Sequence, residues 1–305
     1  MNLKITIGIP TYNQASFIEK AVQSALAQTY PFIEVIVADD CSTDNTTQLL
    51  EKYKADPRFF YKKNNSNLGR VANYRNTLYN LATGDWYINV DGDDWLKDEN
   101  FIQEAVEMIT MNTNIVAVVA DCERCDEANN KTIIYTSSFN NNELIEGTIF
   151  LNAIAQQQAQ TTHLTTLYNR HKAMEIDFYR INILSADFES IYRLLLHGNV
   201  FYFKKVVGVW RKHGKNTVLV KNSSDTTKNF ILPQSVAAYA KTQNINLKNW
   251  ANKILKTMIA ATLVEAKKKN YKQLLQAFFN CLRSYPLATM QTVVNIKKVL
   301  KHIKK

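Results

Sequence analysis

The sequence predicts an α/β fold, in which a mixed, mostly parallel sheet is flanked by helices and followed by a helical C-terminal region. Two observations lead to this prediction. Between residues 4 and 120, short apolar segments typical of strands alternate with segments of helical periodicity, and this order favours a parallel sheet with helices on both faces. From about Leu232 onward the pattern is helical and rich in lysine, without further strand signals.

The first strand and helix follow from a change in pattern. Isoleucine at every second position predicts a strand over residues 4–9, which ends at Pro10. Ser16 and Glu19 have the spacing of a capping box, so we expect a helix to begin there.

The next elements follow by the same rules. Apolar runs bounded by polar turns predict strands at 33–38, 59–61, 86–90 and 115–120. Ser42–Asp44 offer N-caps for one helix that ends near Lys54, and helical periodicity predicts others at 71–81 and 101–111. After residue 120 the alternation becomes irregular.

Length and composition are those of a folded globular protein. The 305 residues are 46% hydrophobic and 21% charged, which excludes disordered and fibrous classes. No segment approaches the roughly 20 apolar residues that a membrane-spanning helix needs, and the first residues lack the apolar core of a signal peptide. We therefore expect a cytoplasmic protein. Cys122 and Cys125 have CxxC spacing, but no second pair completes a zinc site.

The net charge of +10 is concentrated in the C-terminal region. Residues 241–305 hold 14 of the 37 basic residues and one of the 27 acids, so the rest of the chain is slightly acidic. Apolar and lysine side chains of residues 287–305 separate onto two sides of a helix. This pattern suits an anionic membrane surface, and it equally suits a helix packed on the rest of the protein.

Polar and acidic residues follow three of the predicted strands. Thr11–Asn13 follow the first, Asp39–Asp40 end the second, and Asp91–Asp94 follow the fourth. Ligands of an open α/β sheet bind outside the carboxyl ends of its strands, so we expect these residues to form one site. Crowded carboxylates repel one another unless a cation lies among them, and aspartates together with substrate phosphates hold Mg²⁺ or Mn²⁺. The alternative for Asp91–Asp94 is an acidic turn before a helix.

Six short segments stand in the order and spacing of a known family. They are Pro10–Asn13, Asp39–Asp44, Asn67–Gly69, Arg75–Asn76, Gly84–Ile88 and Asp91–Asp94. Together they resemble the nucleotide-binding half of family 2 glycosyltransferases, which have the Rossmann-like GT-A fold. The resemblance implies a nucleotide-sugar-binding half at 1–110 and an acceptor-binding half with the catalytic base at 111–220. The basic helical region 230–305 resembles nothing in the family.

The resemblance implies how the donor nucleotide binds. In this family the residue at Tyr12 lies against the base, and the one at Asp40 accepts a hydrogen bond from a base ring nitrogen. A carboxylate that accepts from an imide N–H suits uracil and not cytosine, so a UDP-sugar is the expected donor. Pro10 and Asn13 belong to the same binding segment. Arg75 either contacts the nucleotide or forms a surface ion pair.

The resemblance also implies a divalent metal, Mn²⁺ or Mg²⁺. Asp93 would be its main ligand, Asp91 would face the ribose, and Gly92 is the small residue between them. A metal there stabilises the charge that develops on the diphosphate as the sugar leaves. Asp94 is expected to cap the next helix instead.

Two later segments complete the implied site. Trp210–His213 resembles a basic loop that closes over the diphosphate, with Arg211 as a phosphate donor and His213 as a donor or metal ligand. Asp187, at the start of a predicted helix, is the expected catalytic base, although Ala186 replaces the glutamate that usually precedes it. Glu189 is the nearest alternative base.

The expected activity is that of an inverting, metal-dependent glycosyltransferase. It would move a hexose or N-acetylhexosamine from a UDP-sugar to a hydroxyl of a glycan or lipid-linked saccharide in surface polysaccharide synthesis. A sugar nucleotidyltransferase is the first alternative, but it needs a glycine-rich loop that residues 9–13 lack. A nucleic-acid-binding protein is the second, without any supporting motif. We expect no nucleic-acid partner and a peripheral contact of the C-terminal helices with the inner face of the membrane; a homo-oligomer is left open.

Overall fold

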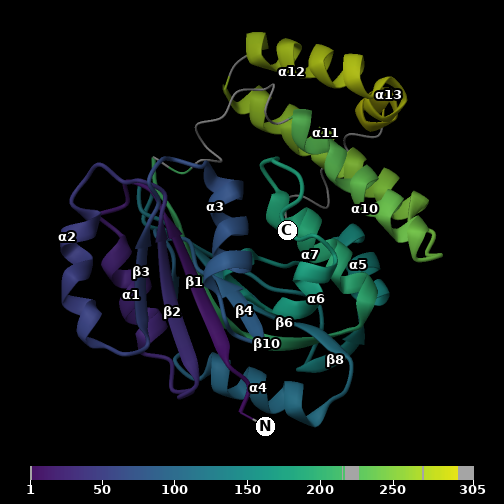
Figure 1. The fold of residues 1–305 in the computed structure, drawn as a ribbon. Coiled ribbons are helices and arrows are strands. Elements are labelled where there is room, and N and C mark those ends of the chain that lie inside the picture. The colour runs from purple at the N-terminus through teal and green to yellow at the C-terminus, as the bar shows by residue number, and fades with distance from the viewer. Residues whose placement is uncertain (1, 215, 217–226, 270, 295–305) are drawn as a thin grey trace.

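The computed structural model describes residues 2–214, 216, 227–269 and 271–294. Its strands form one mixed, ten-stranded sheet (Figure 1). The strands are β1 (Ile5–Thr11), β2 (Ile33–Asp39), β3 (Phe59–Lys63), β4 (Trp86–Asn89), β5 (Trp95–Leu96), β6 (Ile115–Asp126), β7 (Lys131–Tyr135), β8 (Glu143–Glu146), β9 (Thr166–Asn169) and β10 (Asn199–Lys212).

The strand order explains why the polar residues meet. The main path is β3-β2-β1-β4-β9-β6-β10-β5, with β7 beside β6 and β8 beside β10. The strands β1, β2, β3 and β4 are parallel, and Thr11 pairs with Asp39 at the ends of β1 and β2. The residues that follow these strands therefore lie at one edge of the sheet.

Helices cover both faces of the sheet (Figure 1). They are α1 (Ile18–Leu26), α2 (Thr46–Leu50), α3 (Arg70–Asn76), α4 (Phe101–Met111), α5 (Gly147–Ala155), α6 (Arg170–Glu175), α7 (Ala186–Leu194), α10 (Leu232–Thr242), α11 (Lys248–Lys269), α12 (Tyr271–Ser284) and α13 (Pro286–Val294). One buried cluster joins α1 and α4 to the strands, and a second joins α3, α5, α6 and α7 to them. The predicted fold class is confirmed.

Several local expectations need correction. The capping box does not form, because α1 begins at Ile18 without a side-chain cap; the carbonyl of Gln14 accepts from the amides of Phe17 and Ile18 instead. The helix expected at 71–81 is an α-helix to Asn76 followed by a π-helical turn. One sheet contains strands from both expected halves of the domain, because β9 pairs with β4, and β6 and β10 continue the order beyond β9.

The C-terminal helices stack outward from α7 and the sheet. α10 packs on α7, α11 packs on α10, and α12 and α13 pack on α11, as Figure 1 shows. A small core between them contains Phe230, Leu255, Ile259 and Cys281. None of the helices in the described ranges combines the length and the apolar character that crossing a bilayer requires.

Gly147, the first residue of α5, lies against the backbone that follows α7. A Cβ atom there would lie 1.8 Å from the carbonyl oxygen of Leu195 and 2.6 Å from that of Gly198. Since backbone atoms cannot turn aside as a side chain does, we expect Gly147→Ala to lower the free energy of unfolding by roughly 1–3 kcal/mol. Gly214→Ala is the control, because nothing lies within 4 Å of the added atom. Equal midpoints in urea unfolding would contradict this close packing.

Candidate active site

Two adjoining pockets open at the carboxyl edge of β1, β2 and β4. The first has a volume of about 450 Å³ and the second of about 510 Å³. They share Arg70, Asp91, Leu184 and Trp210 in their walls. A ligand in the first pocket and a ligand in the second would therefore meet at these four residues.

The first pocket brings together most of the residues that the sequence suggested for the donor. Its lining includes Pro10, Tyr12, Asn13, Asp40, Asp91, Asp93 and His213. The Tyr12 side chain is 48% exposed and lines the pocket, so part of its ring is accessible to a ligand. Gly92 lies between the two aspartates, and a Cβ atom there would lie 2.5 Å from Gln14 Oε1. A larger residue at this position would require the Gln14 side chain to move.

Asp40 joins the end of β2 to the start of α3. Its Oδ1 accepts from the Leu68 amide at 2.7 Å and from Asn64 Nδ2 at 3.0 Å, and its Oδ2 accepts from the Gly69 amide at 2.9 Å. These bonds fix the carboxylate in the pocket wall. Oδ2 has one further lone pair, which can accept from a ligand.

Asp91, Asp93 and Asp94 form a cluster whose ligand oxygens lie within 4.8 Å of one another. Burial, and then the charge of Asp93, raises the pKa of Asp91 to about 6. Burial, and then the charges of Asp93 and Asp91, raise the pKa of Asp94 well above its usual value. Three carboxylates held this closely are unfavourable as bare anions, and a set of carboxylate oxygens fits Mg²⁺ or Mn²⁺.

Asp93 lines the first pocket, but not the second, and lies beside His213. Its Oδ2 lies 2.9 Å from His213 Nε2 and 3.2 Å from Asn216 Nδ2. The His213 ring also packs on Phe17, with ring centroids 4.5 Å apart. The histidine is thus positioned beside the carboxylate that the sequence suggested as the main metal ligand.

Asp94 does not cap a helix, contrary to expectation. Its Oδ1 accepts from the backbone amide of Arg211 at 2.8 Å, and α4 begins only at Phe101. Asp94 therefore joins the acidic turn to the end of β10.

Arg211 does not line either pocket, although it was expected to donate to the phosphates. Its Nε donates to the Asp93 carbonyl at 3.0 Å, and its Nη1 pairs with Glu127. The guanidinium lies 4.9 Å from the ring centroids of both Phe17 and Trp95. Because neighbouring strand residues point to opposite faces, Trp210 lines the pockets and Arg211 points away.

Arg75 also lies outside the two pockets. Its Nη1 donates to the Phe178 carbonyl and pairs with Asp177, both at 2.7 Å, so it forms the ion pair that was the alternative. The sequence did not single out Arg70, which lines both pockets. Its Nη2 donates to the carbonyls of Ile183 and Leu184 at 3.2 and 2.6 Å. Its position directly after Gly69, at the start of α3, is the sequence feature that could have indicated a role in the site.

Asp187 lies in the first turn of α7 and lines the second pocket. Burial raises its pKa, and the positive charge of Arg70 acts in the opposite direction. The Ser185 amide before it donates to Asn229 Oδ1 at 2.8 Å, which fixes the start of the helix. Asp187 is thus a carboxylate held at the wall of a pocket and facing a cation.

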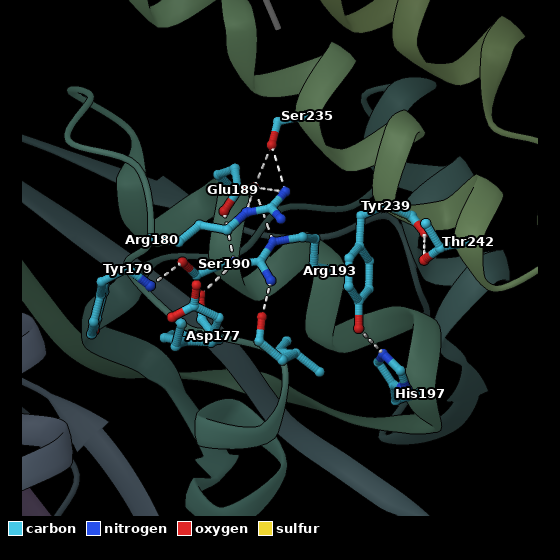
Figure 2. Close-up of polar contacts among 12 residues, drawn as sticks. Asp177, Tyr179, Arg180, Glu189, Ser190, Arg193, His197, Ser235, Tyr239 and Thr242 are labelled. Carbon is cyan, nitrogen blue, oxygen red and sulfur yellow. Dashed lines mark hydrogen bonds and ion pairs between the residues drawn. The ribbon is translucent and has the colours of Figure 1, made fainter.

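Glu189 cannot serve as the alternative base. Its side chain is fully buried and pairs with Arg180 at 3.0 Å and Arg193 at 2.9 Å. The Ser235 hydroxyl of α10 donates to it at 2.6 Å. Figure 2 shows this network between α7 and α10. Both carboxylate oxygens are therefore occupied by structural contacts.

Comparison with known proteins identifies the family to which this chain is similar. Residues 6–174, more than half of the chain, match the family model for glycosyl transferase family 2. An uncharacterized glycosyltransferase of Mycoplasma pneumoniae is 38% identical over 129 residues, which cover 40% of this chain and 42% of the relative. TarS, the poly(ribitol-phosphate) β-N-acetylglucosaminyltransferase of Staphylococcus aureus, is 31% identical over 119 residues, which cover 38% of this chain and 21% of TarS. The chain thus matches less than half the length of either relative.

Two solved structures share the fold. TarS residues 1–349 in complex with UDP-GlcNAc have a TM-score of 0.70 at 17% identity, over 99% of this chain and 92% of that one. The mannosyltransferase PcManGT of Pyrobaculum calidifontis, in complex with GDP-Man and Mn²⁺, has a TM-score of 0.55 at 17% identity, over 100% and 87%. These likenesses confirm the predicted GT-A fold.

Arg70 is the one lining residue of the two pockets, within the described part of the chain, that carries a permanent positive charge. We expect Arg70→Gln to weaken the binding of a nucleoside diphosphate by roughly tenfold or more, because a hydrogen bond to a charged group contributes about 1.5–3 kcal/mol. Arg75→Gln, outside the pockets, is the matched control. Calorimetric titration of both variants checks this, and an equal loss of affinity would contradict the assignment.

Proposed function

The chain belongs to glycosyl transferase family 2, and on that premise we propose that it transfers a hexose or N-acetylhexosamine from a UDP-sugar to a saccharide hydroxyl with inversion. The observation that carries the proposal is the arrangement of the two pockets. An acidic cluster with Asp93 lines one, Asp187 lines the other, and Arg70 and Trp210 belong to both. A donor and an acceptor bound in these pockets would meet at the shared wall.

The first pocket is the proposed donor site. Tyr12 would stack on the base, and Asp40 would accept from the imide N–H of uracil. The TarS complex with UDP-GlcNAc supports a uridine donor, whereas the complex of PcManGT with GDP-Man shows that the fold also accommodates guanosine donors. Asp40 disfavours cytosine, which has no such N–H donor, and the TarS complex supports the choice of uracil over guanine.

A divalent cation, Mn²⁺ or Mg²⁺, is the proposed cofactor. Asp93 would hold it, with Asp91 and His213 nearby; this is supported by the oxygens of the acidic cluster and by the Mn²⁺ in the PcManGT complex. When bound, the cation would neutralise the charge that the diphosphate gains as the sugar leaves. Arg70 adds a fixed positive charge on the side of the pocket shared with the acceptor.

Asp187 is the proposed general base. Its raised pKa makes it a stronger proton acceptor than an exposed aspartate, and the nearby Arg70 favours its ionised form. It would take the proton of the acceptor hydroxyl as that oxygen attacks the anomeric carbon. Because attack and departure occur on opposite faces of the sugar, one displacement inverts the configuration, as in inverting hydrolases.

The second pocket is the proposed acceptor site. Aromatic side chains in its wall can pack on the apolar face of a sugar ring; they are Tyr135, Phe188, Tyr192 and Trp210. We propose a glycan or lipid-linked saccharide as the acceptor, in surface polysaccharide synthesis on the cytoplasmic side of the membrane.

The nucleotide preference can be tested by thermal shift. We expect UDP with Mn²⁺ to raise the melting temperature more than GDP, CDP or ADP with Mn²⁺, because a ligand that binds only the native state stabilises it in proportion to its affinity. Equal shifts for the four nucleotides would contradict the uridine assignment.

Asp187→Asn tests the general base. The two side chains are nearly isosteric, so we expect the variant to fold and bind UDP like the parent but to lose transfer by about 10²–10⁴. The parent rate should fall with acidification at a pH above the usual aspartate pKa of 3.8, since protonated Asp187 cannot accept a proton. Protonation of Asp91, whose pKa is raised to about 6, affects parent and variant alike, so the variant should lack only the part of the fall that comes from Asp187. Glu189→Gln is the control. Retained turnover in Asp187→Asn together with its loss in folded Glu189→Gln would contradict the assignment.

A further inference from the structure

The C-terminal helices carry an apolar surface that the transfer reaction does not use. Tyr271 and Phe279 of α12 are 71% and 58% exposed, and Leu287 and Val294 of α13 are 78% and 79% exposed. Large apolar side chains gathered on a surface usually mark an interaction site. We call these four residues, together with Leu275 and Met290, the α12–α13 face.

The exposed side chains of α12 follow the helical period. Tyr271, Leu275 and Phe279 are each four residues apart, so they lie on one side of the helix. Exposed basic residues adjoin this stripe, because Lys272 follows Tyr271 and Arg283 lies one turn beyond Phe279. The buried side of α12 is formed by other residues, Ala277 and Cys281. The exposed stripe is therefore separate from the packing of α12 on α11.

The α12–α13 face lies at the outside of the molecule. α11 separates α12 and α13 from α10 and from the sheet, as Figure 1 shows, with α12 and α13 in yellow. In the described part of the chain, these side chains are therefore accessible to a partner.

Charge identifies the kind of partner. Residues 248–294 contain eight basic residues and one acid, Glu265, which pairs with Lys268 at 3.2 Å; residues 295–305, which lie outside the described ranges, add five lysines to the sequence. A second copy would bring these positive charges together. Nucleic acid would pair with the basic residues but would not bury the apolar stripe. An anionic lipid surface satisfies both features.

We propose that the α12–α13 face binds an anionic membrane surface. Tyr271, Phe279 and Leu287 enter the boundary between head groups and acyl chains, while Lys272 and Arg283 contact lipid phosphates. This binding does not depend on the proposed transfer reaction.

The packing of α10 connects this surface to the acceptor pocket. Ser235 of α10 donates to Glu189 of α7, and Tyr239 of α10 contacts His197 at 2.8 Å (Figure 2). Asp187 precedes Glu189 by two residues in the first turn of α7. Membrane binding would therefore hold the second pocket in a fixed relation to the bilayer, which suits a lipid-linked acceptor. This last consequence depends on the proposed function.

Co-sedimentation of the full chain with vesicles tests the proposal. We expect binding to vesicles of phosphatidylcholine with phosphatidylglycerol, little binding to phosphatidylcholine alone, and release at ~0.5 M salt because the Debye length falls to a few ångströms. Binding to both vesicle types alike, or to neither, would overturn the proposal.

Matched double variants test the residues. Tyr271→Ser with Phe279→Ser should reduce binding at least about tenfold, and Lys272→Glu with Arg283→Glu should do so as well, since each basic residue near the surface contributes about 1 kcal/mol. Phe60→Ser with Met111→Ser removes two exposed apolar side chains elsewhere and should bind like the parent.

Three further outcomes are decisive. Parental binding by the α12 variants would overturn the proposal. So would a concentration-dependent dimer that Tyr271→Ser with Phe279→Ser abolishes, because the partner would then be a second copy, and so would binding of duplex DNA in preference to vesicles. Asp187→Asn should bind vesicles like the parent. The membrane proposal can therefore be judged even if the proposed transfer reaction is wrong.

Discussion

The close approach of three carboxylates at one edge of the sheet is the constraint on which the rest of the site depends. Asp91 accepts from Tyr74 and Asn89, Asp94 accepts from the Arg211 amide, and Asp93 lies beside His213. These bonds orient the acids without neutralising them, as the raised pKa of Asp91 shows. The fold thus holds three carboxyl groups together where the parallel strands end, and burial together with their mutual repulsion raises the pKa of Asp91 and of Asp94.

Arg70 connects that acidic cluster to the second pocket. Its guanidinium binds the carbonyls of Ile183 and Leu184 and lies near both Asp91 and Asp187. The segment that leads into α7 is therefore held against the start of α3. In the proposed reaction this places a cation between the leaving diphosphate and the base, so one residue serves both pockets.

The sequence predicted best what depends on strand ends, because parallel strands bring their carboxyl ends to one edge whatever the details of packing. Tyr12, Asp40 and Asp93 reach one pocket for this reason. It predicted side-chain direction less well. The position of Arg75 on its helix directs its side chain away from the pockets, where Asp177 pairs with it. The alternation of side chains along β10 directs Arg211 away from them. A motif gives the position of a residue in the chain, whereas its direction depends on partners that are distant in sequence.

The central claim is that the acidic cluster holds a divalent cation together with the nucleotide. Calorimetric titration of Mn²⁺ into the full chain with saturating UDP, and into Asp93→Ala under the same conditions, tests it most directly. The account predicts uptake of one Mn²⁺ per chain that strengthens with UDP and disappears in the variant, because the carboxylate of Asp93 is the proposed main ligand. No uptake by the parent, or the same uptake by the variant, would contradict the account.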